Sequence, residues 1–197
     1  MHKEPLAAYI QAIIDLTPPQ LALVLSLFEP VRQPKRTMLL QAGQVNQYMN
    51  FIQRGSIRIF FIREDGQEAT RHLAFEQQFI TSLASFITQQ PSHEYVQTLE
   101  ACDILRISRK NFYYLLDCLP AWEKFFRHYL ENAYLINLRV YQREITKDAE
   151  QRYQELLALS PQVVLRLPNK MVASYLNMSP ETLSRVKARL LPLPPPQ

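Results

Sequence analysis

The sequence is poor in the residues that build phosphate loops and metal sites: 197 residues include three Gly, two Cys and four His. So few glycines argue against a loop whose backbone amides cradle a phosphate. Cys102 and Cys118 are too few and too isolated for a disulfide framework, and they lack the spacing of a zinc or iron–sulfur site. We therefore expect reduced, buried thiols, no metal and no cofactor.

Long apolar runs and catalytic motifs are missing too. No run of about 18 apolar residues is present, and the N-terminus Met-His-Lys-Glu-Pro lacks the apolar core of a secretion signal. The sequence therefore predicts a cytoplasmic protein without a membrane partner. No nucleophile elbow or paired His-Cys arrangement appears, so we do not expect an enzyme. A barrel-type metal-binding enzyme is the alternative, although only His72 and His93 fall in the region expected to form strands.

Hydrophobic periodicity divides the chain into three regions. Residues 5–28 have a helical pattern, and Thr17 before Pro18-Pro19 marks a helix start. From residue 31 to 108 the period changes to two, with turns at Gly43, Gly55 and Asp65-Gly66. Short strands at this spacing favour a β-barrel or jelly roll, and Asp65-Gly66 predicts a hairpin.

A long helix is predicted over about 115–144. Apolar residues recur every three or four positions, as in a heptad seam that needs a partner helix. We predict that a dimer seam is formed by Trp122, Phe126, Tyr129, Ala133, Ile136 and Val140. A second stripe, Phe125, Leu130, Leu138 and Tyr141, would then lie on the barrel. The alternative is a helix buried entirely within one chain.

Residues 168–190 predict two short helices joined by a tight turn, the pattern of a helix-turn-helix. Asn177 interrupts the apolar faces and tolerates the left-handed conformation of a turn. Ser179 can cap the second helix, which starts at Pro180. The side chains expected to contact DNA are Ser179, Glu181, Thr182, Ser184, Arg185, Lys187 and Arg189, with Lys170 on the first helix. An ordinary helical hairpin is the alternative.

Thr146 is expected to begin the C-terminal domain, giving domains 1–145 and 146–197. The second domain carries seven Lys and Arg against four Asp and Glu, an excess placed where phosphate contacts are needed. The run Val163 to Leu167 favours a strand beside the DNA-reading helices, as in a winged unit. A full wing after the second helix is not expected, because the chain ends in Pro-Leu-Pro-Pro-Pro-Gln.

Barrel, long helix and helix-turn-helix in this order resemble the Crp/Fnr family of bacterial transcription regulators. The resemblance rests on the run Phe51 to Arg58, the Glu64 to Glu68 hairpin and the C-terminal Glu181-x-x-Ser184-Arg185. It implies an α+β fold with an N-terminal cyclic-nucleotide-binding-like β jelly roll, a long dimerisation helix and a C-terminal (winged) helix-turn-helix domain. It also implies that Glu181, Ser184 and Arg185 read bases, since arginine suits guanine and glutamate suits the cytosine amino group.

The sequence departs from this family at the effector site. Thr81 and Ser82 stand where cyclic-nucleotide-binding members have glycine and glutamate, and Ser92 stands at the position of their phosphate-binding arginine. Glu94 would place a negative charge near any phosphate, and an anion buried without a cationic partner is costly. The candidate effector pocket comprises Phe79, Thr81, Ser82, Leu83, Ser92, His93 and Val96. We expect no productive binding of cyclic AMP.

The sequence thus predicts a DNA-binding transcription regulator that acts as a homodimer on a pseudo-palindromic operator. Its expected partners are double-stranded DNA and a second copy of the chain; RNA polymerase and an unidentified small-molecule effector are further candidates. The alternative is a protein-interaction or scaffold module that has lost DNA binding.

Overall fold

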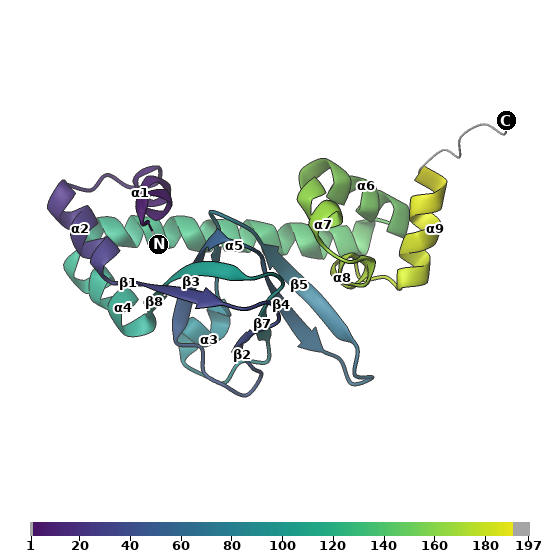
Figure 1. Ribbon diagram of the computed structural model, residues 1–197, viewed down its shortest axis with the longest axis horizontal. Coiled ribbons are helices and arrows are strands. Elements are labelled where there is room, and N and C mark those ends of the chain that lie inside the picture. The colour runs from purple at the N-terminus through teal and green to yellow at the C-terminus, as the bar shows by residue number, and fades with distance from the viewer. Residues whose placement is uncertain (1, 191–197) are drawn as a thin grey trace. The chain divides into compact units, whose positions relative to one another are not determined.

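The computed structural model describes residues 2–190 (Figure 1). Within these residues, eight strands form two four-stranded sheets with the orders β1-β8-β3-β6 and β2-β7-β4-β5. The strands are β1 (Phe28–Gln33), β2 (Met38–Leu40), β3 (Tyr48–Arg54), β4 (Ile57–Ile62), β5 (Glu68–Ala74), β6 (Phe79–Ile80), β7 (Tyr95–Thr98) and β8 (Cys102–Ser108). Each registered pair is antiparallel. The predicted jelly roll is confirmed.

The period-two pattern gives each sheet two different faces, because successive side chains of a strand point to opposite sides. One buried cluster is aliphatic and contains Leu40, Ile52, Ile57, Ile59, Val96 and Ile104 from both sheets. The neighbouring residues on β3 and β8, among them Phe51 and Leu105, belong to a second, aromatic-rich cluster. The two clusters lie on opposite faces of the sheet that contains β3 and β8.

Five helices contribute to the second cluster, four of them with several residues and the fifth, α3 (Leu83–Thr88), with a single ring. The four are α1 (Glu4–Gln11), α2 (Pro18–Ser26), α4 (Arg109–Cys118) and the N-terminal half of α5 (Pro120–Thr146). Trp122 and Phe125 stack with ring centroids 4.3 Å apart, and Phe112 meets Trp122 edge-on at 5.4 Å. Trp122 is fully buried. The short helix α3 contributes Phe86 to the same cluster.

The helix expected over about 115–144 is in fact two helices. Leu119 ends α4 in an extended conformation, with φ −134° and ψ 93°. The cause is Pro120, since its ring disfavours helical backbone in the preceding residue. Residues 115–118 therefore belong to α4, and α5 begins at Pro120.

The chain forms two compact units, which differ from a simple division along the sequence. The first contains residues 1–61 and 72–133, and the second contains residues 62–71 together with the chain from Tyr134 onward. The second unit includes the C-terminal half of α5, α6 (Ala149–Leu159), α7 (Pro161–Arg166), α8 (Asn169–Tyr175) and α9 (Pro180–Leu190). The predicted boundary at 145/146 did not anticipate that the 62–71 hairpin groups with these helices.

The strand predicted at 163–167 is wrong, because these residues lie in α7 and its C-cap. Pro161 occupies the first turn, where its missing N–H costs nothing, and Val163 is buried in the small unit. Of the described residues after α5, none forms a strand.

Two turn glycines allow a matched test of the barrel. Gly55 has φ +99°, and a Cβ there would lie 2.6 Å from Cys102 Sγ and 2.8 Å from the Ala101 carbonyl oxygen. Gly66 has φ +80° with open space around it. We expect Gly55→Ala to lower the free energy of unfolding by about 2–4 kcal/mol and Gly66→Ala by about 1 kcal/mol, measured by urea unfolding. Equal losses would contradict the role of the Cys102 contact.

Candidate nucleic-acid interface

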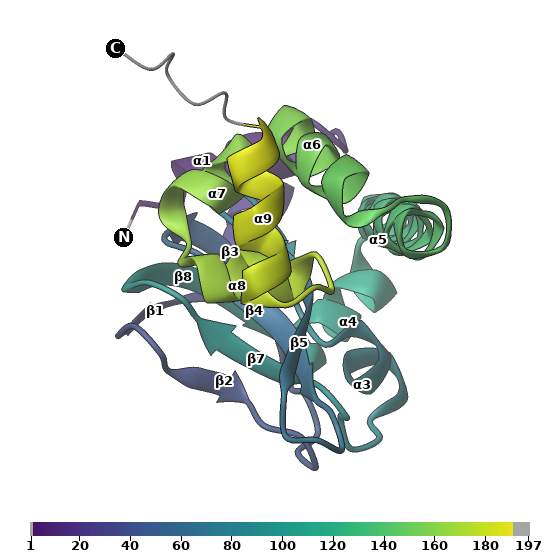
Figure 2. The ribbon, with the colours of Figure 1, turned by 90° about the vertical axis from the view of Figure 1, so that its right-hand side faces the viewer.

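Helices α8 and α9 are joined by a tight turn over residues 176–179 (Figure 2). Asn177 has φ 51°, the left-handed conformation predicted for it. The Met178 N–H donates to the Ala173 carbonyl at 3.0 Å and closes the end of α8. The apolar faces of the pair are buried with residues of α6 and α7: Val172, Ala173, Leu176, Leu183 and Val186 with Tyr153, Leu156, Val163 and Leu167. The sequence thus forms the predicted helix-turn-helix.

The first turn of α9 carries a short chain of polar contacts. Ser179 Oγ accepts a hydrogen bond from the Thr182 N–H at 3.1 Å, which confirms the predicted cap. Thr182 Oγ1 in turn accepts from Arg185 Nη2 at 3.2 Å. This contact orients the guanidinium on the exposed surface of α9, at the N-terminal part of the helix that enters the major groove in a helix-turn-helix.

Glu181 lies fully exposed at the same end of α9. A hydrogen bond from its own backbone N–H, and then one from Ser179, holds the pKa of its carboxyl below the usual range. The nearby Arg185 acts in the same direction. The positive end of the helix dipole favours the carboxylate here. Glu181 therefore presents a charged acceptor beside the Arg185 donor.

The other residues predicted to contact DNA differ in their exposure to solvent. Lys170, Ser184 and Arg189 are exposed. Lys187 is half-buried, because its Nζ donates to Asn169 Oδ1 at 2.5 Å and lies 5.8 Å from the centroid of the Tyr153 ring. Lys187 therefore ties α9 to α8 and α6 and is less available to a phosphate than the other three.

The polar groups of the predicted effector segment form hydrogen bonds with one another. Ser82 Oγ donates to Glu94 Oε2 at 2.6 Å and lies 3.0 Å from Ser92 Oγ. The Glu94 N–H donates to Ser92 Oγ at 2.9 Å. Ser82 and Ser92 are buried. The hydroxyls that stand where a phosphate would be held are thus engaged by a carboxylate, which would also repel an incoming anion.

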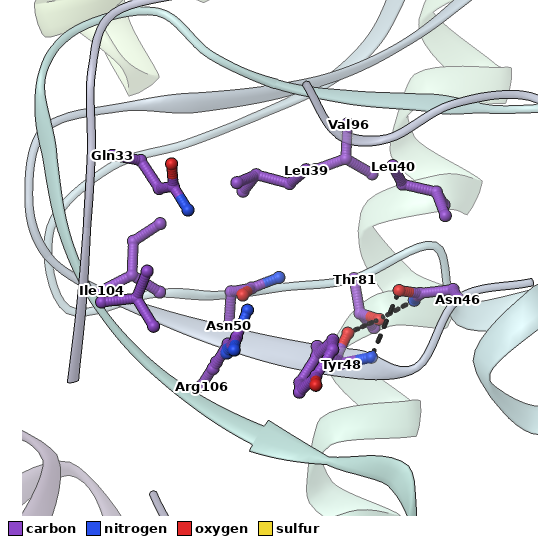
Figure 3. Close-up of a pocket in the computed structure, with 11 residues that line it drawn as sticks. Gln33, Leu39, Leu40, Asn46, Tyr48, Asn50, Thr81, Val96, Ile104 and Arg106 are labelled. Carbon is purple, nitrogen blue, oxygen red and sulfur yellow. Dashed lines mark hydrogen bonds between the residues drawn. The ribbon is translucent and has the colours of Figure 1, made fainter. Parts of the chain in front are cut away.

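A small cavity of about 30 Å³ lies between the sheets near this segment (Figure 3). It has room for water molecules, whereas pockets for drug-sized ligands span about 300–1,000 Å³. The lining residues are Val31, Gln33, Leu39, Leu40, Asn46, Tyr48, Asn50, Thr81, Val96, Ile104 and Arg106. Of the predicted effector residues, Thr81 and Val96 line it.

Sequence reasoning missed the polar wall of this cavity. Tyr48 and Asn50 on β3 alternate with Met49 and Phe51, which lie in the aromatic-rich cluster. This alternation alone places the side chains of Tyr48 and Asn50 on the opposite face of the strand, toward the cavity. Asn46 Nδ2 donates to Thr81 Oγ1 at 2.5 Å, which joins the wall to the effector segment. The charge of Arg106 is matched by Glu29 at 3.2 Å. The wall therefore offers amide and hydroxyl groups for hydrogen bonds inside the barrel.

Three other predicted effector residues lie away from the cavity lining. Phe79 is a core residue whose ring packs against Tyr9, Phe51 and Phe125 at 5.1–5.7 Å. Its place in β6 points it into the aromatic cluster, so its assignment to the pocket was wrong. Leu83 begins α3 and is half-buried, and His93 is exposed.

The predicted dimer seam is divided between core and surface. Trp122 is fully buried in the first unit, and Phe126 and Tyr129 pack against the same cluster. Further along α5, Ala133 and Val140 are half-buried and Ile136 is 41% exposed. The most exposed apolar side chains lie on another face of the helix: Tyr134, Tyr141 and Ile145 are 66%, 65% and 64% exposed.

Within residues 2–190, no helix combines the length and the hydrophobicity that a bilayer span requires. Within the same residues, no group of three or more His, Cys, Asp or Glu is placed to hold a metal ion.

The hydrogen bonds at the start of α9 predict how the stability of this helix depends on pH. Because the folded-state pKa of Glu181 is lowered, its charge stabilises α9 above the unfolded-state pKa of about 4.3, and this contribution is lost as the pH falls. We expect an NMR titration to give Glu181 a pKa below that of an ordinary glutamate, and Ser179→Ala to raise it. An unchanged pKa in the Ser179→Ala variant would contradict this account.

The barrel matches the model of the cyclic nucleotide-binding domain over residues 30–117. The chain is 27% identical over 104 residues to the cAMP-activated global transcriptional regulator CRP of Salmonella typhimurium, a match that covers 53% of this chain. The same values hold for CRP of Klebsiella aerogenes. The chain spans about half the length of the curated relatives it matches.

Solved structures extend the likeness of the fold over most of the chain. The c-di-GMP responsive global regulator CLP of Xanthomonas campestris aligns with a TM-score of 0.71 at 19% identity, over 88% of this chain and 91% of CLP. FixK2 of Bradyrhizobium japonicum aligns with a TM-score of 0.72 at 11% identity, over 83% and 84%. The resemblance to the Crp/Fnr family is thus confirmed at the level of the fold: residues 30–117 match the cyclic nucleotide-binding domain, and the chain has the fold of these regulators.

Proposed function

We propose that this protein is a sequence-specific DNA-binding transcription regulator, which acts as a homodimer on a pseudo-palindromic operator without control by cyclic AMP. The observation that carries the proposal is the exposed face of α9. Ser179, Glu181, Thr182 and Arg185 form an ordered polar cluster at the start of a helix whose apolar face is buried. Base-edge reading requires such a preset pairing of donor and acceptor groups.

DNA binding also agrees with the charge of the C-terminal part of the chain. Lys170 and Arg189 are exposed at the two ends of the helix pair. Contacts of this kind with phosphates position a protein on the duplex but carry no sequence information. Arg185 and Glu181 are therefore assigned to reading, and the outer lysine and arginine to positioning.

A dimer is supported by the free apolar stripe of α5. Tyr134, Leu138, Tyr141 and Ile145 are spaced by four, three and four residues, the spacing of a heptad seam. Three of these four side chains are more than 60% exposed, which is unusual for large apolar groups at one face of a helix. We assign the seam to this stripe, with a second copy of the chain as its partner. Two reading helices held in this way would meet half-sites about one helical turn of DNA apart.

Independence from cyclic AMP rests on the effector segment. Glu94 holds the Ser82 hydroxyl at 2.6 Å, and no arginine stands at the position of Ser92. A cyclic phosphate entering here would have to displace a carboxylate from its hydrogen bond and lie beside it, with serine at the position where relatives have arginine. Both costs oppose binding.

Arg185 provides the test of DNA reading. In an operator selected from a random duplex pool, Arg185→Ala is expected to weaken specific binding by about 1–3 kcal/mol and to leave binding to random DNA nearly unchanged. The measurement is fluorescence anisotropy at physiological salt, with and without cyclic AMP. Arg127→Ala, on an exposed turn of α5, is the matched control. Equal losses on both DNAs would contradict base reading, and a selection that depends on cyclic AMP would contradict the account of the effector segment.

A pair of charge insertions on α5 tests the dimer surface. Tyr141→Glu would place a charge in the proposed seam and is expected to raise the dimer dissociation constant at least about tenfold in sedimentation velocity. Ile136→Glu lies on the other face, where the sequence placed the seam, and is expected to have a much smaller effect. The reverse order would return the interface to Ile136 and Val140, and two unchanged dimers would exclude both faces.

A further inference from the structure

The hairpin at residues 62–71 is joined to the helix-turn-helix by the side chain of Ser174. β5 is the edge strand of its sheet, so its outer backbone groups have no neighbouring strand. Ser174 Oγ, on α8, accepts from the Thr70 N–H at 2.9 Å and donates to the Glu68 carbonyl oxygen at 2.8 Å. One hydroxyl thus satisfies two backbone groups of the strand edge, which a neighbouring strand would otherwise pair.

A second set of contacts reaches the turn that precedes α9. Arg63 Nη2 donates to Asn177 Oδ1 at 2.5 Å, and Asn177 Nδ2 donates to Glu144 Oε2 at 2.8 Å. The turn residue is therefore held between the hairpin and the last turn of α5. Arg143 adds a hydrogen bond from Nη2 to the Tyr175 carbonyl oxygen at 3.2 Å. The backbone at the end of α8 is fixed from two sides.

These contacts leave the proposed reading face uncovered. The hairpin engages Met171, Ser174 and Asn177, which lie on α8 and in the turn. Glu181, Ser184, Arg185 and Arg189 on α9 remain exposed. A hairpin that binds the outer side of α8 can therefore stay in place when α9 enters a groove.

We propose that the 62–71 hairpin is the wing of the reading unit: Ser174 and Asn177 are positioning residues, through which the hairpin holds α9 in its DNA-competent orientation. The described C-terminal residues form helices only, so the sheet component that a winged unit needs comes from the hairpin between β4 and β5. This inference rests on the proposed function for its effect on DNA binding, but the joint itself can be measured without DNA.

The first arm of the test uses amide hydrogen exchange of the full-length protein without DNA. Ser174→Ala removes both hydrogen bonds and is expected to lower the protection of the α8 and α9 amides by about three- to tenfold. Ser174→Thr keeps the hydroxyl and is expected to restore most of the protection. Gln154→Ala, at an exposed position of α6, is the control for a substitution in the same unit. Exchange in Ser174→Ala that equals the control would overturn the proposal.

The second arm locks the joint with a disulfide. Thr70 Oγ1 and Ser174 Oγ are 3.0 Å apart, so cysteines at both positions place their sulfur atoms near bonding distance. Thr70→Cys with Ser174→Cys is made in a Cys118→Ser background, which removes the exposed thiol. The oxidised protein is expected to bind the selected operator within about twofold of wild type, and Ser174→Ala to bind it about three- to tenfold more weakly.

The outcomes separate the two proposals. An oxidised variant whose operator affinity falls tenfold or more would overturn the inference, because the docked hairpin would then be incompatible with DNA. Operator affinity of Ser174→Ala equal to that of Gln154→Ala would overturn it as well. If the wild-type protein selects no operator, the proposed function fails, and hydrogen exchange alone decides whether the hairpin holds α8 and α9.

Discussion

The stack of Trp122 on Phe125 is the contact on which the arrangement of α5 depends. The two rings are 4.3 Å apart and lie in a cluster with Phe112 and Phe79. Because a helix repeats every 3.6 residues, burying these rings fixes the rotation of the whole helix about its axis. Phe126 and Tyr129 then turn to the same cluster, and the stripe Tyr134, Leu138, Tyr141 and Ile145 is left on another face. The first turns of α5 thus decide which of its apolar side chains remain exposed.

The sequence predicts best those features that local chemistry determines. The left-handed Asn177, the Ser179 cap and the hairpin at Asp65-Gly66 each follow from a few adjacent residues, and the structure contains all three. The alternating pattern likewise predicts the strands of the jelly roll. Features that depend on contacts between residues far apart in the sequence were harder to predict. Both stripes of α5 are apolar, so periodicity could not decide which one packs on the barrel, and the run Val163 to Leu167 suits a strand or a helix equally well.

The predicted effector segment keeps its place in the barrel, but its polar side chains bind one another. Thr81, Ser82 and Ser92 were predicted to lie together, and they do, but hydrogen bonds from Asn46 and to Glu94 use their polar groups. The Glu94 carboxylate accepts a hydrogen bond from the Ser82 hydroxyl, which lies beside the Ser92 hydroxyl. It satisfies the buried hydroxyl groups, which would otherwise be costly. The polar wall of Tyr48, Asn50 and Asn46 remains as a hydrogen-bonding surface inside the barrel, around a cavity with room for water molecules.

Hydrogen bonds make the joint between hairpin and α8 sensitive to small displacements. The bonds of Ser174 are 2.8 and 2.9 Å long, and such a bond is effectively lost beyond about 3.5 Å. A shift of the hairpin by less than about 1 Å would therefore break both bonds. β4 and β5 continue along the chain from the hairpin into the barrel, so a rearrangement of strand pairing there reaches Thr70 and Arg63 through the backbone. Because a strand repeats every ~3.3 Å, even a one-residue slip exceeds this tolerance. The joint between the hairpin and α8 is thus either made or broken.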